Sequence, residues 1–278
     1  MLNFCCPNCK QPLTGQGNSL VCEKNHCFDK AKSGYVNLLL PNKMNSKTPG
    51  DNKIMVDTRN EFLSKGYYSV LKDELCKQVL EIATSLHKDM IQLLDAGCGE
   101  GYYTTAMAEY LENNHLHASI LGVDISKLAL NIAAKRTKSV QFGVASVFDI
   151  PVEEGSCDIV TELFAPYCGE EFYRVLKRGG ILILVIPSQE HLYELKQAVY
   201  ENPYKNDVKD YNLEGFELQS KTEVFSEIEI DNQEDIKNLF MMTPYYYKTS
   251  KEDTARLMKL ERLHTKIQFE ILCYRVLK

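Results

Sequence analysis

The sequence predicts an α/β protein, with a doubly wound, mostly parallel sheet preceded by a small metal-binding module. Three observations lead to this prediction. Apolar runs alternate with helical stretches through most of the chain. One apolar run leads directly into a glycine-rich loop, at residues 92–101. Five of the ten cysteines lie within the first 27 residues.

The N-terminal cysteines have the spacing of a zinc site. Cys6 and Cys9 form a C-x2-C pair, and Cys22 and His26 form a C-x3-H pair twelve residues later. Two such pairs on short loops can place four ligands tetrahedrally around zinc. We therefore expect a zinc-binding module over residues 1–42.

Two neighbouring cysteines leave the ligand set open. Cys5 and Cys27 could replace Cys6 and His26, and the cluster could also consist of free thiols. No signal peptide or long apolar segment is seen, so we expect a cytoplasmic protein. In that compartment a cysteine cluster favours metal over disulfides.

The apolar run after residue 90 ends in Asp95 and is followed by Gly97, Gly99 and Gly101. This pattern is typical of a strand that enters a tight loop, because glycine accepts positive φ and lets a ligand lie against bare backbone. A helix is expected next, over roughly 103–111.

A nicotinamide site is the obvious rival for this loop. Its fingerprint is G-x-G-x-x-G, whereas the spacing here is G-x-G-x-G and Tyr102 takes the place of the third glycine. Glu100 would also repel a pyrophosphate. The loop therefore favours a ligand without phosphate that carries positive charge.

A second strand, Ser119–Val123, ends in Asp124. An acidic residue in this place can accept hydrogen bonds from both ribose hydroxyls of a nucleoside. Ser126 is expected to cap the following helix, whose apolar residues at 125, 128, 129, 132 and 133 lie on one face.

The alternation continues to the C-terminus. We expect strands over 140–145, 157–164 and 181–186, a helix over 171–177 ended by Gly179 and Gly180, and a closing antiparallel pair over 222–230 and 268–277. Ligands of such sheets bind at the carboxyl ends of the strands, which places the pocket near residues 95, 124, 145 and 164.

Charge divides the chain. The whole chain has a formal charge of −6, but residues 1–53 carry +4 and the remaining 225 residues −10. Basic residues around a small zinc module suggest a contact with a phosphate backbone, although they could equally be solvated surface. They are Lys24, Lys30, Lys32, Lys43, Lys47 and Lys53.

Taken together, these motifs resemble those of the RlmA type of 23S rRNA (guanine-N1)-methyltransferases, whose methyltransferase domain is the class I, S-adenosylmethionine-dependent kind with a seven-stranded sheet. The resemblance covers nearly the whole chain. It rests on the zinc knuckles and the segments 28–39, Pro49–Asp51, Arg59, Phe62-Leu63, Gly66–Tyr68, 95–104, Phe164–Pro166, Pro187 and His191–Lys196.

The resemblance implies methyl transfer from S-adenosylmethionine (SAM) to N1 of a guanine in a hairpin of 23S rRNA, with the zinc module assisting RNA recognition and with a homodimer as the assembly. No membrane or DNA partner is expected. It implies cofactor contacts by Tyr68, by Gly99 with Glu100, and by His191. With the strand-end acids, the cofactor set becomes Tyr68, Asp95, Gly97, Gly99, Glu100, Gly101, Asp124 and His191.

The chemistry requires a base for the N1 proton, because guanine N1 is a poor nucleophile until that proton leaves. Glu162, near the end of the fourth strand, is the candidate, and Phe164 is the candidate for stacking on the target base. Residues 43–85 are expected to form a helical linker that contributes to the SAM pocket, and residues 86–278 the methyltransferase domain.

Two alternatives stay open. A methyltransferase of a small molecule would have no need of a basic zinc module. A non-catalytic interaction protein that only keeps the SAM fold is disfavoured by the intact loop from Asp95 to Gly101 and by Asp124.

Overall fold

The computed structural model describes residues 2–43, 50–207, 211–247 and 249–278. Lys47 and Pro49, which the sequence analysis singles out, lie outside the described residues. Within the described part, no helix is both long and apolar enough to cross a membrane.

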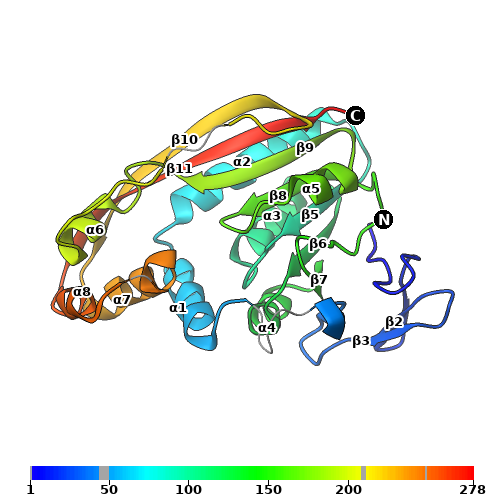
Figure 1. Cartoon of the computed structure of the whole chain (residues 1–278). Helices are drawn as coiled ribbons and strands as arrows, with labels where there is room; N and C mark the ends of the chain where they lie inside the picture. The colour runs from blue at the N-terminus through cyan, green and yellow to red at the C-terminus, as the bar shows by residue number, and fades with distance from the viewer. Residues whose placement is uncertain (1, 44–49, 208–210, 248) are drawn as a thin grey trace.

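The central sheet has eight strands in the order β10-β11-β9-β8-β5-β6-β7-β4 (Figure 1). Strands β4 to β9 pair in parallel, and the C-terminal β11 lies antiparallel between β9 and β10. The strands are β4 (Val36–Asn37), β5 (Ile91–Ala96), β6 (Ala118–Asp124), β7 (Val140–Val144), β8 (Cys157–Leu163), β9 (Leu176–Pro187), β10 (Phe216–Ile230) and β11 (Leu263–Val276). The predicted closing antiparallel pair is therefore confirmed.

Two details of the predicted sheet are wrong. The sheet has an eighth strand, because β4 from the N-terminal module adds to β7 at the edge. The helix expected over 171–177 is α5 (Gly169–Val175), and β9 already begins at Leu176. Gly179 and Gly180 lie inside β9, beside the register shift between Cys157 and Ile159 of β8, and do not end a helix.

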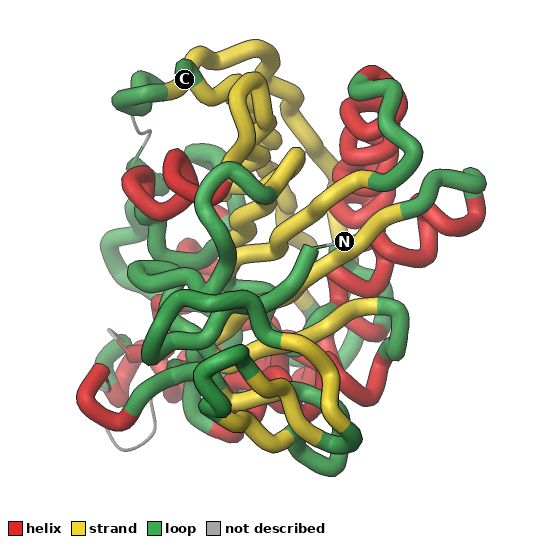
Figure 2. The backbone as a smooth tube through the Cα atoms, turned by 90° about the vertical axis from the view of Figure 1, so that its right-hand side faces the viewer, coloured by secondary structure: helices red, strands yellow, loops and turns green. Residues whose placement is uncertain are grey.

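Each face of the sheet carries its own apolar core. Leu93 of β5 faces α2 (Ser69–Ser85), α3 (Tyr102–Asn113) and α4 (Lys127–Arg136). Its neighbour Leu94 points to the other face, which α5 and the N-terminal module cover. In Figure 2 the longest helices stand on one side of the strands, and the N-terminal module faces the viewer.

The N-terminal module is a small three-stranded antiparallel sheet made of β1 (Thr14–Gln16), β2 (Ser19–Val21) and β3 (Cys27–Asp29), followed by the short helix η1 (Pro41–Lys43). It docks onto the large sheet through Phe4, whose ring lies against Gly143 of β7. The Leu2 N–H donates to Ser119 Oγ over 3.1 Å, and the Leu38 N–H to the Val144 carbonyl over 3.0 Å.

The β10–β11 hairpin extends well beyond the rest of the sheet (Figure 1). Its far end carries α6 (Tyr193–Val199), α7 (Gln233–Met241), η2 (Pro244–Tyr247) and α8 (Lys251–Leu257), and α7 packs on α1 (Lys53–Ser64). These helices include most of the described residues between 231 and 257, and their packing brings α7 against α1.

Candidate functional site

The four predicted zinc ligands converge. Sγ of Cys6, Cys9 and Cys22 and one ring nitrogen of His26 all lie within 4.8 Å of one another. His26 Nδ1 is 3.4 Å from both Cys6 Sγ and Cys22 Sγ, and Cys9 Sγ is 3.6 Å from Cys22 Sγ. Tetrahedral zinc, with bonds of about 2.0 Å to nitrogen and about 2.3 Å to sulfur, requires ligand separations of this size.

Both knuckles have the backbone that a metal site needs. Lys10 and Asn25 adopt positive φ, and their N–H groups donate to the carbonyls of Cys6 and Cys22. Burial opposes ionisation of Cys22, but N–H groups around its sulfur, including that of His26, bring its pKa down to about 7. The donor set and its geometry therefore fit zinc.

The neighbouring cysteines lie outside this group of ligands. Cys27 is exposed at the start of β3. Cys5 is buried, and its N–H donates to the Pro151 carbonyl over 2.7 Å.

The glycine loop joins β5 to α3 at the carboxyl edge of the sheet. Gly97 and Gly101 have φ values of +84° and +77°. A Cβ on Gly97 would lie 2.3 Å from Ala165 Cβ, and one on Gly101 would lie 2.8 Å from Ala133 Cβ. A Cβ on Gly99 would meet nothing within 4 Å, so the middle of the loop faces open space that a ligand could fill.

Three carboxylates surround this loop. Asp124 accepts the Gly99 N–H over 2.9 Å and the Ser126 N–H over 2.7 Å. Asp95 and Glu100 are almost fully buried. Burial raises the pKa of both Glu100 and Asp124, and the nearby Arg59 guanidinium opposes the shift.

Arg59 is a site residue whose role the sequence analysis does not assign. It comes from α1 and pairs with Asp51 over 2.5 Å. Its charge is the largest of the effects that lower the pKa of Glu100 against burial. The only sequence signal for it is its place in the order of family motifs.

Asp95 is expected to make stability depend on pH. Burial raises its pKa from 3.8 to about 6, although the Thr104 and Thr161 hydroxyls donate to it over 2.5 and 2.8 Å. Between pH 3.8 and pH 6, Asp95 keeps its proton in the folded protein but has lost it in the unfolded chain. The free energy of unfolding therefore falls as pH rises through about 6. We expect Asp95→Asn to raise the free energy of unfolding by about 3 kcal/mol at pH 8, and to weaken cofactor binding.

Urea unfolding at several pH values measures this effect. The gain from Asp95→Asn should grow by about 1 kcal/mol between pH 5 and pH 8. Asp149 is the matched control, because Lys43 and Lys10 lower the pKa of its carboxyl against burial and its substitution by Asn should destabilise at high pH. A gain for Asp95→Asn that does not change with pH would contradict the prediction.

Tyr68 and His191, which are 123 residues apart in sequence, meet at the far side of the site. The Tyr68 hydroxyl lies 3.4 Å from His191 Nε2. The Gln268 N–H donates to His191 Nδ1 over 3.2 Å, which leaves the ring proton on Nε2. Burial lowers the pKa of His191 to about 3 and raises that of Tyr68 well above its usual value, so both groups are neutral donors.

Two buried hydroxyls near these residues have no hydrogen-bond partner in the described part of the chain, those of Tyr103 and Ser188. Tyr103 follows the glycine loop, and Ser188 follows β9 and accepts the His191 N–H at its carbonyl. Buried polar atoms are normally paired, so these two hydroxyls fit a site that a polar ligand completes.

The two predicted catalytic residues lie at the end of β8 and differ in their exposure. Phe164 has a φ of +58° and is 48% exposed, with its ring 5.6 Å from that of Phe269. Glu162 is buried, and its Oε1 accepts the Ala165 N–H over 2.5 Å. This bond closes the turn that presents Phe164.

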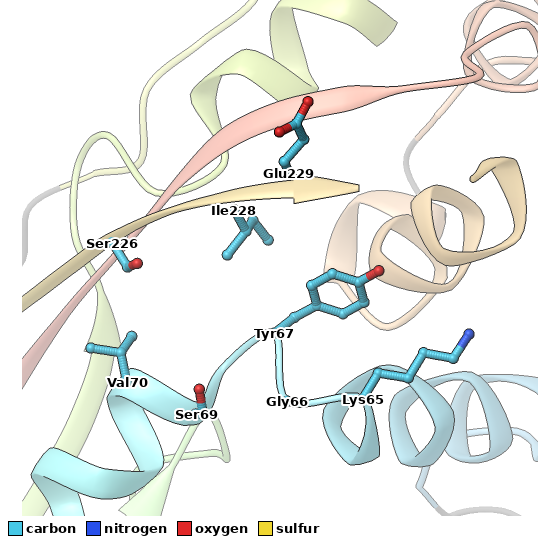
Figure 3. Close-up of a pocket in the computed structure, with 8 residues that line it drawn as sticks. All are labelled: Lys65, Gly66, Tyr67, Ser69, Val70, Ser226, Ile228 and Glu229. Carbon is cyan, nitrogen blue, oxygen red and sulfur yellow. The ribbon is translucent and has the colours of Figure 1, made fainter. Parts of the chain in front are cut away.

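A separate pocket of about 250 Å³ lies between the α1–α2 turn and β10 (Figure 3). Tyr67 and Lys65 on its wall reach Asp235 of α7, with contacts of 2.9 and 2.5 Å. The predicted cofactor residues do not line it. The contacts of Tyr67 and Lys65 with Asp235 tie the α1–α2 turn, which also carries Tyr68, to α7.

Two sequence families match the chain, one described as a methyltransferase domain over residues 87–243 and one as "RlmA, N-terminal" over residues 4–47. A 23S rRNA (guanine(748)-N(1))-methyltransferase of Streptomyces fradiae is 34% identical, over 70% of this chain and 66% of that protein. Two putative 23S rRNA (guanine-N(1)-)-methyltransferases are also similar. The Bacillus subtilis protein is 28% identical over 97% of this chain and 95% of its own length, and the Micromonospora griseorubida protein 31% identical over 68% and 67%.

Proposed function

Because the chain belongs to the RlmA-type family of 23S rRNA (guanine-N1)-methyltransferases, we propose that it transfers a methyl group from SAM to N1 of a guanine in 23S rRNA. The observation that carries this proposal is that the zinc module and the methyltransferase sheet share one apolar core, so both parts act as one unit. A methyltransferase of small molecules has no evident use for such a docked module.

Its cofactors are SAM and zinc. SAM supplies the activated methyl group. The carboxylates Asp95, Glu100 and Asp124 suit the cationic and ribose parts of that cofactor, and Tyr68 with His191 suits its polar methionine end. Cys6, Cys9, Cys22 and His26 hold the zinc, which stabilises the N-terminal module.

At the target base, the enzyme must orient N1 toward the methyl group and remove its proton. We propose that Phe164 stacks on the guanine, because an exposed aromatic ring at a strand end offers a flat apolar surface to a flipped base. Glu162 is the proposed proton acceptor. Its carboxylate also fixes the Ala165 N–H, so it can act by shaping the Phe164 turn.

The lysines of the zinc module are proposed to contact the RNA backbone. Lys24 and Lys32 are exposed. Lys10 and Lys43 both pair with Asp149, over 2.9 and 2.5 Å. Exposed pairs of this kind contribute roughly 0–1 kcal/mol each, so an RNA phosphate could displace Asp149 at little cost.

We also propose the domain boundaries, the location and the oligomeric state of the protein. They are the division into residues 1–42, 43–85 and 86–278, a cytoplasmic location with the ribosomal RNA, and a homodimer. Light scattering on the purified protein measures the last of these directly.

Methyl transfer from radiolabelled SAM to 23S rRNA that lacks its natural methylations tests the proposal. We expect label in 1-methylguanosine. Phe164→Ala should lower the single-turnover rate by about tenfold to a hundredfold, since stacking on one base is worth roughly 1–3 kcal/mol. Phe164→Tyr is the matched control and should keep most of the rate.

Each other outcome points to a different reading. Tight SAM binding with no label in RNA would reject rRNA as the substrate and favour a small molecule. Absence of SAM binding would favour the non-catalytic protein. Equal losses of rate and of SAM affinity in Phe164→Ala would show that this ring supports the fold and does not stack on a base.

A further inference from the structure

Lys196 is a buried cation next to the cofactor site, and the proposed function does not yet use it. It is the last residue of the family motif His191–Lys196 and is 1% exposed. The rings of Tyr204 and Tyr245 cover its ammonium, at 4.3 and 4.8 Å from their centroids. Among the described residues it makes no ion pair, and burial lowers its pKa.

A buried charge without an oppositely charged partner is unusual in a folded protein. Removing an ammonium from water is expensive, and such groups are normally paired with a carboxylate or a bound ion. The aromatic faces of Tyr204 and Tyr245 compensate part of that loss. The exposed Asp207 also supports the charge of Lys196, but only through its field.

A short chain of hydrogen bonds links Lys196 to the cofactor site. Its Nζ donates to Asn206 Oδ1 over 2.7 Å. Asn206 Nδ2 donates to the carbonyls of Ser188 and His191, over 2.8 and 3.3 Å. The cation therefore lies directly behind the residues that carry the neutral donors of the site, and its charge helps to keep His191 unprotonated.

The site has opposite electrical character at its two ends. Asp95, Glu100 and Asp124 make the end near β5 and β6 acidic. The end near β9 has the neutral donors of Tyr68 and His191, with Lys196 behind them. The sulfonium of SAM lies between its ribose and its methionine moiety, and its one negative group is the carboxylate of the methionine moiety, so that moiety suits the end of the site near Lys196.

We propose that Lys196 is a positioning residue for the cofactor, whose buried charge, acting across Asn206 and His191, holds the carboxylate of the methionine moiety at the end of β9. Tyr204 and Tyr245 then have a role. Their rings keep water away from the Lys196 ammonium. Water would otherwise screen the electric field of that charge. This inference rests on the cofactor, and it is independent of the RNA substrate.

Calorimetric titration with a matched pair of ligands tests it. SAM and decarboxylated SAM differ only in the carboxylate. Lys196→Met should weaken SAM binding by about tenfold, since that factor corresponds to a modest charge–charge interaction in a partly screened interior. Its affinity for decarboxylated SAM should stay within about twofold of the wild-type value. Lys196→Arg keeps the charge and should retain the preference for SAM.

A second variant covers the case in which Lys196→Met does not fold. Asn206→Asp leaves Lys196 in place but gives it a carboxylate partner, and it should weaken SAM selectively in the same way. The surface substitution Lys205→Met is the matched control, because Lys205 is 48% exposed and pairs with Glu190. An equal loss of affinity for both ligands, or no loss for either, would overturn the proposal. No RNA is present, so the result does not depend on the substrate.

Discussion

Replacing Cys9 by serine is expected to open the whole N-terminal module. Zinc binding contributes on the order of 10 kcal/mol to small structural sites, and a module of this size cannot bury enough apolar surface to replace it. The described part of the module has only short strands, its core residues Phe4, Leu13 and Leu20 belong to the same apolar cluster as the large sheet, and the Phe4 ring lies against Gly143 of β7. Loss of one ligand should therefore release that contact as well.

Zinc content and hydrogen exchange measure this effect together. Cys9→Ser should bind less than one zinc per chain and should lose protection at the Leu38 amide, whose N–H donates to the Val144 carbonyl of β7. Methyl transfer to rRNA should fall more than SAM affinity, because the cofactor loop lies on the other part of the chain. Cys27→Ser is the control, since the exposed Cys27 is outside the cluster. Loss of zinc from Cys27→Ser would mean that the ligand set is wrong.

The features that the sequence predicts well are those with a strong local signal. The strand and glycine loop from Asp95 to Gly101, the cap at Ser126 and the zinc knuckles each depend on residues close together in the chain. The second half of β9, residues 181–186, is a continuous apolar run, and the closing pair alternates. Local chemistry determines these elements, so reading them from the chain succeeds.

The features that it misses depend on distant contacts. Strand β4 has two residues and no pattern of its own, and it forms because the docked module brings Val36 beside Gly143. The sequence predicts a start of β9 at residue 181, five residues after the observed Leu176, for a similar reason. Leu176 pairs with Cys157 across the sheet, and the Lys278 ammonium caps the Leu176 carbonyl from the end of the chain.

The same limit applies to the site. No residue near Tyr68 in the chain indicates that His191 lies beside it. The two side chains meet because both rings pack on Phe269 of β11. Lys196 belongs to a motif that is visible in the sequence. The rings that cover its ammonium, those of Tyr204 and Tyr245, come from segments before and after β10 in the chain. Tertiary packing assembles these groups, so their roles can be argued only from the folded protein.

Gly97→Ala is expected to have the second large effect, because the new methyl group would lie 2.3 Å from Ala165 Cβ. The positive φ of Gly97 adds about 1–2 kcal/mol of strain for any other residue, and overpacking of this kind costs about 1–3 kcal/mol. We expect the free energy of unfolding to fall by roughly 3 kcal/mol or more and SAM affinity to fall by at least about a hundredfold. Urea unfolding and calorimetry measure the two losses separately.

Gly155→Ala is the matched control, since Gly155 has a φ of +60° but no atom within 4 Å of the added Cβ. Its free energy of unfolding should fall only by the strain of a positive φ, and its SAM affinity should not change. The contact of Gly97 with Ala165 adds a functional consequence, because the same turn presents Phe164. Displacing that turn should lower methyl transfer at saturating SAM as well. Full transfer at saturating SAM in Gly97→Ala would show that the cofactor loop and the Phe164 turn move independently.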